Sequence, residues 1–214
     1  MMIQETKELA RYVPQRRGKK WITKVTEGGI GDKYNGGIHS LESFQKAVAM
    51  LEHAAHTWRS PRLFHLILTG ADADQYNAFL AEFCRMLRRA DVDAEYVACI
   101  EHDVIKRLHM HCFIVIGTKD KKPSRFITIA NEADAAKPST LQQALRLAQV
   151  ACPALMVRVQ RPAMHPTVYM ELNQSNNHFL NEACEWISYY AKVRSKPLSG
   201  RCYYASKRAA RTSH

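Results

Sequence analysis

Residues 95–116 have the sequence EYVACIEHDVIKRLHMHCFIVI, in which two apolar runs are separated by a short charged connection. The runs Glu95 to His102 and Leu108 to Ile116 are rich in β-branched and aromatic residues, which favour strands. The connection is short enough for a tight turn, so we expect a β-hairpin. If the hairpin closes through residues 104–106, Glu101 lies opposite His109.

The segments on either side of this hairpin alternate between strand and helix patterns. Before it come an apolar run at residues 63–69, ended by Gly70, and a segment at 76–87 with apolar residues at helical spacing. After it come a helical pattern at 139–150 and short β-rich pieces at 155–159 and 167–172. This order predicts an α+β protein with a ferredoxin-like, split βαβ antiparallel sheet covered by helices.

Two further helices are expected near the ends of the chain. Apolar residues recur at helical spacing from Leu41 to Leu51, and a last helix is expected from about His178 to Lys192. We expect residues 1–60 to form a basic, partly helical N-terminal extension packed on the core. Residues 61–214 are expected to form the main domain, which ends in a basic tail.

The composition indicates an anionic partner. The 214-residue chain has a formal net charge of +11, and the positive side chains are concentrated near both ends. Such a field attracts and steers polyanions, with nucleic acid as the leading candidate. No apolar run approaches the ~18 residues of a membrane span, so we expect a soluble, cytoplasmic protein without a membrane partner.

Other common site patterns are missing from the sequence. The glycines between residues 28 and 37 match neither the dinucleotide fingerprint nor the phosphate-binding loop. The six cysteines form no CxxC pair, which favours buried, reduced thiols over a disulfide framework or a zinc knuckle.

The second strand of the hairpin begins with a histidine pair. His109 and His111 are two residues apart, so their side chains point to the same face of a strand. Glu101, opposite His109, completes a set of two imidazoles and one carboxylate that suits a divalent cation such as Mg²⁺ or Mn²⁺. A chance grouping on a half-solvated sheet is the alternative, and a one-residue register slip would replace Glu101 by His102.

Two adjacent tyrosines lie near the end of the last expected helix. Helical phase places Tyr190 beside the apolar face, where core packing is expected, and Tyr189 on the opposite side with Lys192. A tyrosine hydroxyl, whose pKa is about 10, needs a base, a cation or a metal to act as a nucleophile. A solvent-capped aromatic is the alternative role for Tyr189.

With the sequence HMH at 109–111, Glu101 upstream and YYAK at 189–192 downstream, the chain resembles the HUH endonucleases of rolling-circle replication. It is most similar to the replication initiators of filamentous phages and related prophages, over roughly residues 63–208. The resemblance implies the HUH endonuclease fold, metal ligation by Glu101, His109 and His111, nucleophilic attack by Tyr189, and a positioning role for Lys192.

The resemblance also implies the reaction and the partners. Single-stranded DNA at a replication origin would be nicked and rejoined through a 5′-phosphotyrosyl intermediate. The expected partners are this strand, an origin hairpin or duplex, and the helicase and polymerase of a bacterial host. Two alternatives remain open, a nucleic-acid-binding regulator that never cuts and an HUH transposase or relaxase. Relaxases generally carry the tyrosine near the N-terminus, where Tyr12 is a rival.

Overall fold

The computed structural model describes the backbone in a series of segments and the side chains in a slightly smaller set. The backbone is described at residues 9–10, 12–17, 20–25, 39–103, 107–118, 139–162, 167–172, 182–184, 186–187, 190 and 203–206. Side chains are described at 43–102, 108–117, 139–162, 167–172, 182–184, 186–187, 190 and 203–206.

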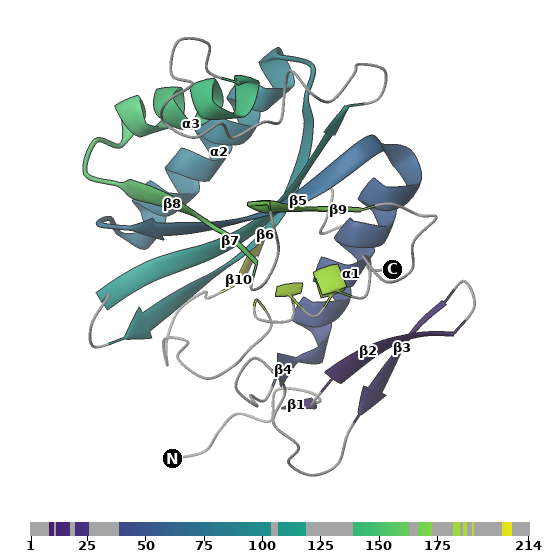
Figure 1. The fold of residues 1–214 in the computed structure, drawn as a ribbon. Coiled ribbons are helices and arrows are strands. Elements are labelled where there is room, and N and C mark those ends of the chain that lie inside the picture. Colours follow the sequence, from purple (N-terminus) through teal and green to yellow (C-terminus); the bar gives the residue numbers. More distant parts are fainter. Residues whose placement is uncertain are drawn as a thin grey trace.

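Three helices and ten strands are assigned in the described segments (Figure 1). The helices are α1 (Leu41–Thr57), α2 (Ala73–Arg89) and α3 (Thr140–Ala151). The strands are β1 (Leu9–Ala10), β2 (Tyr12–Arg17), β3 (Lys20–Val25), β4 (His39–Ser40), β5 (Arg59–Thr69), β6 (Asp93–Asp103), β7 (Arg107–Thr118), β8 (Met156–Gln160), β9 (Tyr169–Glu171) and β10 (Tyr203–Ala205). Each helix or strand pattern predicted between residues 41 and 172 corresponds to one of these elements.

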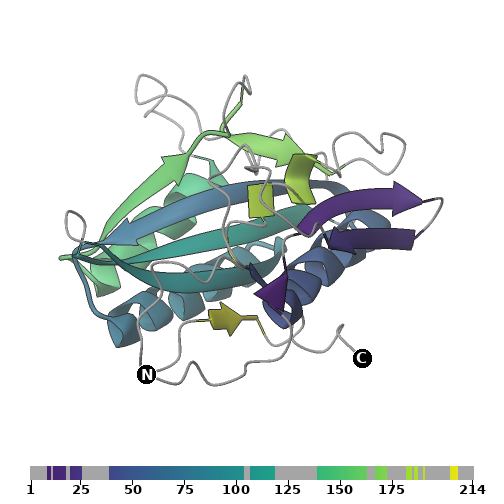
Figure 2. The ribbon, with the colours of Figure 1, turned by 90° about the horizontal axis from the view of Figure 1, so that it is seen from below.

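Six of these strands form one antiparallel sheet in the order β10-β6-β7-β5-β8, with β9 also paired to β5. Figure 2 shows β8 at one edge of the sheet and β10 at the other edge. The chain order β5-α2-β6-β7-α3-β8, with β7 between β5 and β6, is consistent with the predicted ferredoxin-like arrangement. The class is therefore α+β with an antiparallel sheet. Two short pairs, β1 with β4 and β2 with β3, lie outside this sheet.

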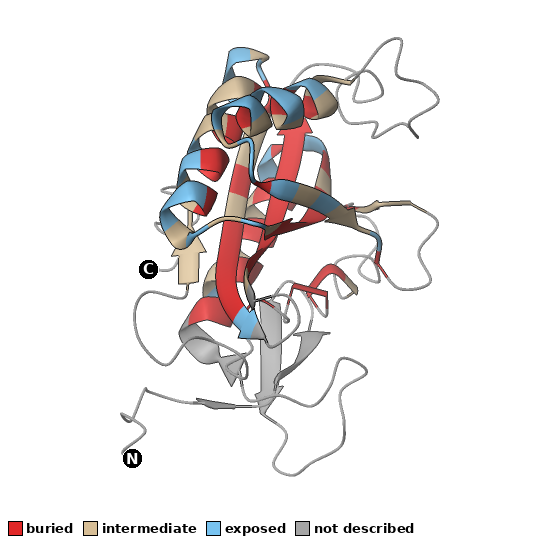
Figure 3. Cartoon of the chain, turned by 90° about the vertical axis from the view of Figure 1, so that its left-hand side faces the viewer, coloured by how far each residue is buried: buried red, intermediate tan, exposed pale blue. Residues whose placement is uncertain are grey.

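Helices cover both faces of the sheet (Figure 1). On one face, α2 and α3 pack against apolar side chains of the central strands. On the other face, α1 and described residues of the C-terminal segment pack against apolar side chains of the sheet. Figure 3 shows that the central strands are mostly buried and that the outer sides of α2 and α3 are exposed. The division at residue 60 remains a prediction, although α1 contributes Phe44, Met50 and Leu51 to the core.

Local sequence sets the beginning of two helices. Asp72 caps α2 by accepting a hydrogen bond from the backbone N–H of Gln75, whose side chain accepts one from the backbone N–H of Asp72. Ser139 and Gln142 form the same capping box at the start of α3. Each box satisfies backbone donors that have no partner inside the helix, which fixes where the helix begins.

Gly70 ends β5 in a conformation that favours glycine. Its φ is +82°, and a Cβ at this position would lie 2.6 Å from the carbonyl oxygen of Ala154. The turn after β5 therefore packs directly against the connection between α3 and β8.

In the part of the chain that the structure describes, no helix has both the length and the apolar character needed to cross a bilayer.

Candidate metal centre

The predicted register of the hairpin is confirmed. Glu101 on β6 pairs with His109 on β7, and Cys99 pairs with His111. Because alternate residues of a strand point to the same face, Glu101, His109 and His111 share one face of the sheet. The slipped register is excluded, and His102 is exposed on the other side of the strand.

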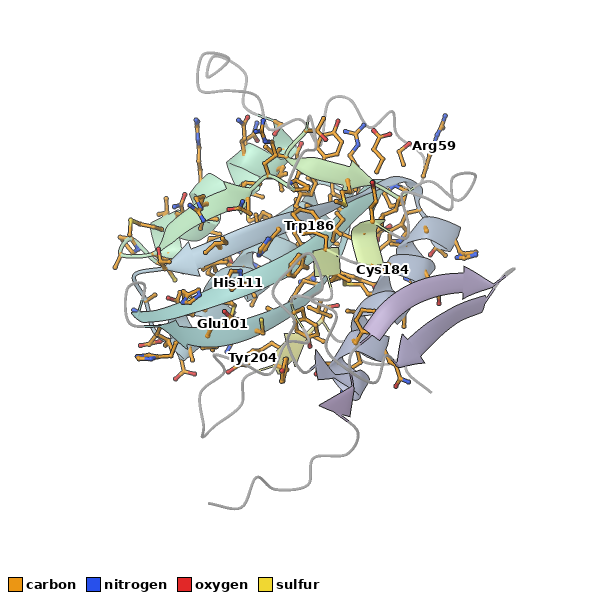
Figure 4. All side chains as sticks on the ribbon, turned by 60° about the horizontal axis from the view of Figure 1, so that its bottom comes forward. Arg59, Glu101, His111, Cys184, Trp186 and Tyr204 are labelled. Atoms are coloured by element: carbon orange, nitrogen blue, oxygen red, sulfur yellow. The ribbon has the colours of Figure 1, made fainter. Side chains whose placement is uncertain are left out.

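Glu101, His109 and His111 form a compact, buried cluster. One carboxylate oxygen of Glu101, Oε2, lies 3.7 Å from Nε2 of His109 and 3.7 Å from Nε2 of His111. The three residues each offer one ligand atom, and these atoms lie within 4.8 Å of one another. The exposed fractions are 3% for Glu101, 1% for His109 and 4% for His111. Figure 4 shows Glu101 and His111 on neighbouring strands.

This geometry fits a bound divalent cation. A distance of 3.7 Å exceeds that of a hydrogen bond. Two ligands that bind one cation at about 2.1 Å, with an angle of about 110–125° between them, are separated by about 3.4–3.7 Å. A buried carboxylate is also costly unless a positive charge compensates it. The three residues can therefore hold a metal ion, as the sequence predicted.

The strand that carries both histidines is anchored at its start by α2. The hydroxyl of Tyr76, a fully buried residue of α2, donates a hydrogen bond of 2.9 Å to the carbonyl oxygen of Leu108. Leu108 directly precedes His109, so this bond holds the beginning of the histidine pair from the opposite side of the sheet.

A third histidine, His65 on β5, adjoins the cluster and was not predicted from the sequence. Its Nε2 lies 2.8 Å from Nδ1 of His111, within hydrogen-bond distance. Its ring stacks on Phe113, with ring centroids 4.1 Å apart and an angle of 13° between the planes. Trp186 contacts the ring edge-on, at 5.5 Å and 80°. His65 is only 5% exposed. The one available signal was a polar residue inside the apolar run at 63–69.

The C-terminal segment reaches the same neighbourhood. Its described residues from 182 to 190 are helical, in agreement with the predicted last helix. Ala183, Cys184 and Ile187 belong to the core beside α1, at spacings that place them on one face of a helix. Trp186 places this segment against His65.

One of the two adjacent tyrosines of this segment lies among the described residues. Tyr190 is 1% exposed and packs edge-on against Tyr203 of β10, with ring centroids 5.4 Å apart. The prediction that Tyr190 belongs to the core is thereby confirmed. Tyr189 and Lys192 lie outside the described residues, and their roles remain predictions.

The face that bears the cluster continues onto strand β8. Thr69 of β5 pairs with both His109 and Met156, and Ile67 pairs with both His111 and Arg158. Met156 is 65% exposed, and Arg158 is also exposed. An exposed apolar side chain and an exposed cation therefore lie in the same two cross-strand rows as the histidines.

The described cysteines behave as the sequence predicted. Cys84, Cys99, Cys112, Cys152 and Cys184 are free thiols, and all but Cys152 are buried. Burial raises the pKa of Cys84 to about 12 and raises that of Cys112 well above its ordinary value. Both thiols are therefore protonated at neutral pH.

Comparison with known proteins found no family model, no curated protein and no solved structure that matches this chain.

Proposed function

We propose that the chain is a metal-dependent endonuclease and strand transferase that nicks and rejoins single-stranded DNA at a replication origin. The observation that carries this proposal is the buried cluster of Glu101, His109 and His111 on two paired strands. Two histidines and one carboxylate suit a catalytic cation, with Mg²⁺ or Mn²⁺ as our first candidates. The antiparallel sheet that carries them is the framework expected for the HUH endonuclease fold.

The cluster would supply the electrostatic part of the reaction. Glu101, His109 and His111 would hold the cation, and a cation bound there supplies Lewis-acid polarisation of a phosphodiester oxygen. The net charge of +11 favours association with a polyanion. Arg158 and Met156, in the same rows as the histidines, would contact a phosphate and a base of the strand.

Tyr189 would supply the nucleophile. Its phenolic oxygen attacks the scissile phosphorus, the bond from phosphorus to the 3′ oxygen breaks, and a 5′-phosphotyrosyl bond forms. The phenolic proton is lost, the leaving 3′ oxygen gains a proton, and Lys192 positions the phosphate. Because the covalent bond conserves the energy of the phosphodiester, rejoining needs no ATP. In support, Trp186, three positions before Tyr189 in the sequence, contacts His65 beside the cluster.

A covalent-adduct assay tests the proposal. Labelled single-stranded oligonucleotides of random sequence are incubated with the protein and Mn²⁺, with or without EDTA. We expect a labelled protein adduct that survives denaturation and that EDTA abolishes. Tyr189→Phe should remove the adduct. Tyr190→Phe, which changes the buried neighbour, is the matched control and should retain it in folded protein. An adduct that depends on Tyr190 would contradict the assignment.

A nucleic-acid-binding regulator that never cuts is the second candidate, favoured by the net charge. It predicts salt-dependent binding of the oligonucleotide without any adduct in Mn²⁺. An HUH transposase would also form the adduct, and an origin next to the gene would distinguish an initiator from it.

A further inference from the structure

We propose that His65 is a positioning residue that accepts a hydrogen bond from Nδ1–H of His111 and thereby keeps Nε2 of His111 available for the cation. The inference builds on the metal centre of the proposed function. It assigns a role to a buried histidine on β5 that lies outside the motif of Glu101, His109 and His111.

The two nitrogens of His111 face different neighbours. Its Nε2 lies 3.7 Å from Oε2 of Glu101, whereas its Nδ1 lies 2.8 Å from Nε2 of His65. A neutral imidazole carries one proton, and only the nitrogen without it can bind a cation. A cation on Nε2 therefore requires the proton on Nδ1, and the atom placed to accept that proton's hydrogen bond is Nε2 of His65.

The surroundings of His65 fix its ring in the orientation that this role needs. Phe113 stacks on the ring in a nearly parallel arrangement, and Trp186 contacts it at nearly a right angle. His65 and Phe113 are directly paired residues of β5 and β7, so the stacking follows from the register of the sheet. Two aromatic contacts on a side chain that is 5% exposed leave little freedom for the ring to turn its Nε2 away from His111.

Such a neighbour is what a metal-binding imidazole generally requires. A ligating histidine usually donates its other N–H to an acceptor, which fixes the tautomer and the orientation of the ring. Carboxylates and backbone carbonyls are common acceptors. Here a second imidazole has that place, so His65 must itself keep its proton on Nδ1 and remain neutral.

Metal affinity tests whether the hydrogen bond matters. Mn²⁺ binding is measured by calorimetry on wild type, His65→Gln, His65→Asn and His65→Phe, with thermal unfolding as the check on folding. The glutamine amide lies about where Nε2 of histidine lies, whereas the asparagine amide is too short to reach His111. We expect the Kd of His65→Phe and His65→Asn to rise about 10–100-fold. His65→Gln should stay within a few-fold of wild type.

His53→Gln is the matched control. His53 is a half-buried histidine of α1, and its Nδ1 lies 3.0 Å from Oε1 of Glu95. Its replacement should leave the Mn²⁺ affinity unchanged. The proposal would be overturned if folded His65→Phe or His65→Asn bound Mn²⁺ with the affinity of wild type. It would also be overturned if His65→Gln lost as much affinity as His65→Asn.

The tautomer is read directly by ¹⁵N NMR on the metal-free wild-type protein at constant pH. We expect His111 to carry its proton on Nδ1 and to show scalar coupling through the hydrogen bond to Nε2 of His65. A proton on Nε2 of His111, or the donor proton on His65, would overturn the proposal. If wild type bound no Mn²⁺ while this coupling was present, the metal centre would be wrong and the histidine pair right.

Discussion

The two faces of strand β7 differ in what their side chains do. Toward α2 and α3 point Met110, Cys112, Ile114 and Ile116, all fully buried and apolar. The side chains that point toward the other face are those of His109, His111, Phe113 and Val115, so two of these four side chains are imidazoles. One face packs a uniform core. On the other face, Phe113 and Val115 belong to the core beside α1, and His109 and His111 belong to the polar cluster.

This difference shows where the fold tolerates a costly arrangement. A buried carboxylate and buried imidazoles destabilise a protein unless they are paired or bind a cation. Apart from Ser43 and Glu95, the buried polar or charged side chains of the described residues are Glu101, His109, His111 and His65. Their concentration at one place is what a functional centre requires and what a purely structural sheet avoids.

The largest expected effect comes from removing the carboxylate of the polar face. Glu101→Gln keeps the size of the side chain but removes its charge, so we expect loss of Mn²⁺ binding. Because a catalytic cation contributes several kcal/mol, adduct formation should fall by at least about 10³-fold. His102→Ala, the exposed neighbour on β6, is the matched control and should retain the rate. A wild-type rate in Glu101→Gln would contradict the assignment of Glu101 to the metal centre.

A change on the apolar face should act on stability instead. Ile114→Ala removes a fully buried side chain between β7 and α2, and we expect the free energy of unfolding to fall by about 2–5 kcal/mol. Urea denaturation measures this loss. The Mn²⁺ affinity of the folded protein should stay at the wild-type value, and a selective loss of affinity would show that the faces are not independent.

The smallest expected effect compares two exposed arginines. Arg158 of β8 lies on the face of the cluster, whereas Arg146 of α3 lies on the other side of the sheet. Arg158→Ala should weaken binding of single-stranded DNA several-fold and lower the slope of log K against log salt by about 1. Fluorescence anisotropy over a salt series measures both. Equal effects of Arg158→Ala and Arg146→Ala would indicate binding without a preferred face.

Local pattern was sufficient to predict the hairpin and its contribution to the site. Apolar spacing predicted the helices between residues 41 and 151. A turn at residues 104–106 predicted the register that places Glu101 opposite His109, with a one-residue slip as the alternative that the structure excludes. These predictions held because each depends on residues that are close in sequence. The strand at 63–69 was placed correctly but begins earlier, at Arg59, because β5 continues beyond Pro61.

The parts that were missed depend on contacts between distant segments. His65 reaches the cluster because Ile67 of β5 pairs with His111 of β7, and no turn in the sequence specifies that register. The pairing of Tyr203 on β10 with Cys99 on β6 likewise joins residues that are far apart in the chain. Neither pairing leaves a local signal, so the third histidine could not be assigned to the site in advance.

Anomalous diffraction from crystals grown with Mn²⁺ tests most directly whether Glu101, His109 and His111 hold one divalent cation. We expect a single strong anomalous peak within about 2.0–2.3 Å of Oε2 of Glu101 and of Nε2 of both His109 and His111. The metal centre would be contradicted if saturating Mn²⁺ gave no peak among these three residues, or gave the peak at another site.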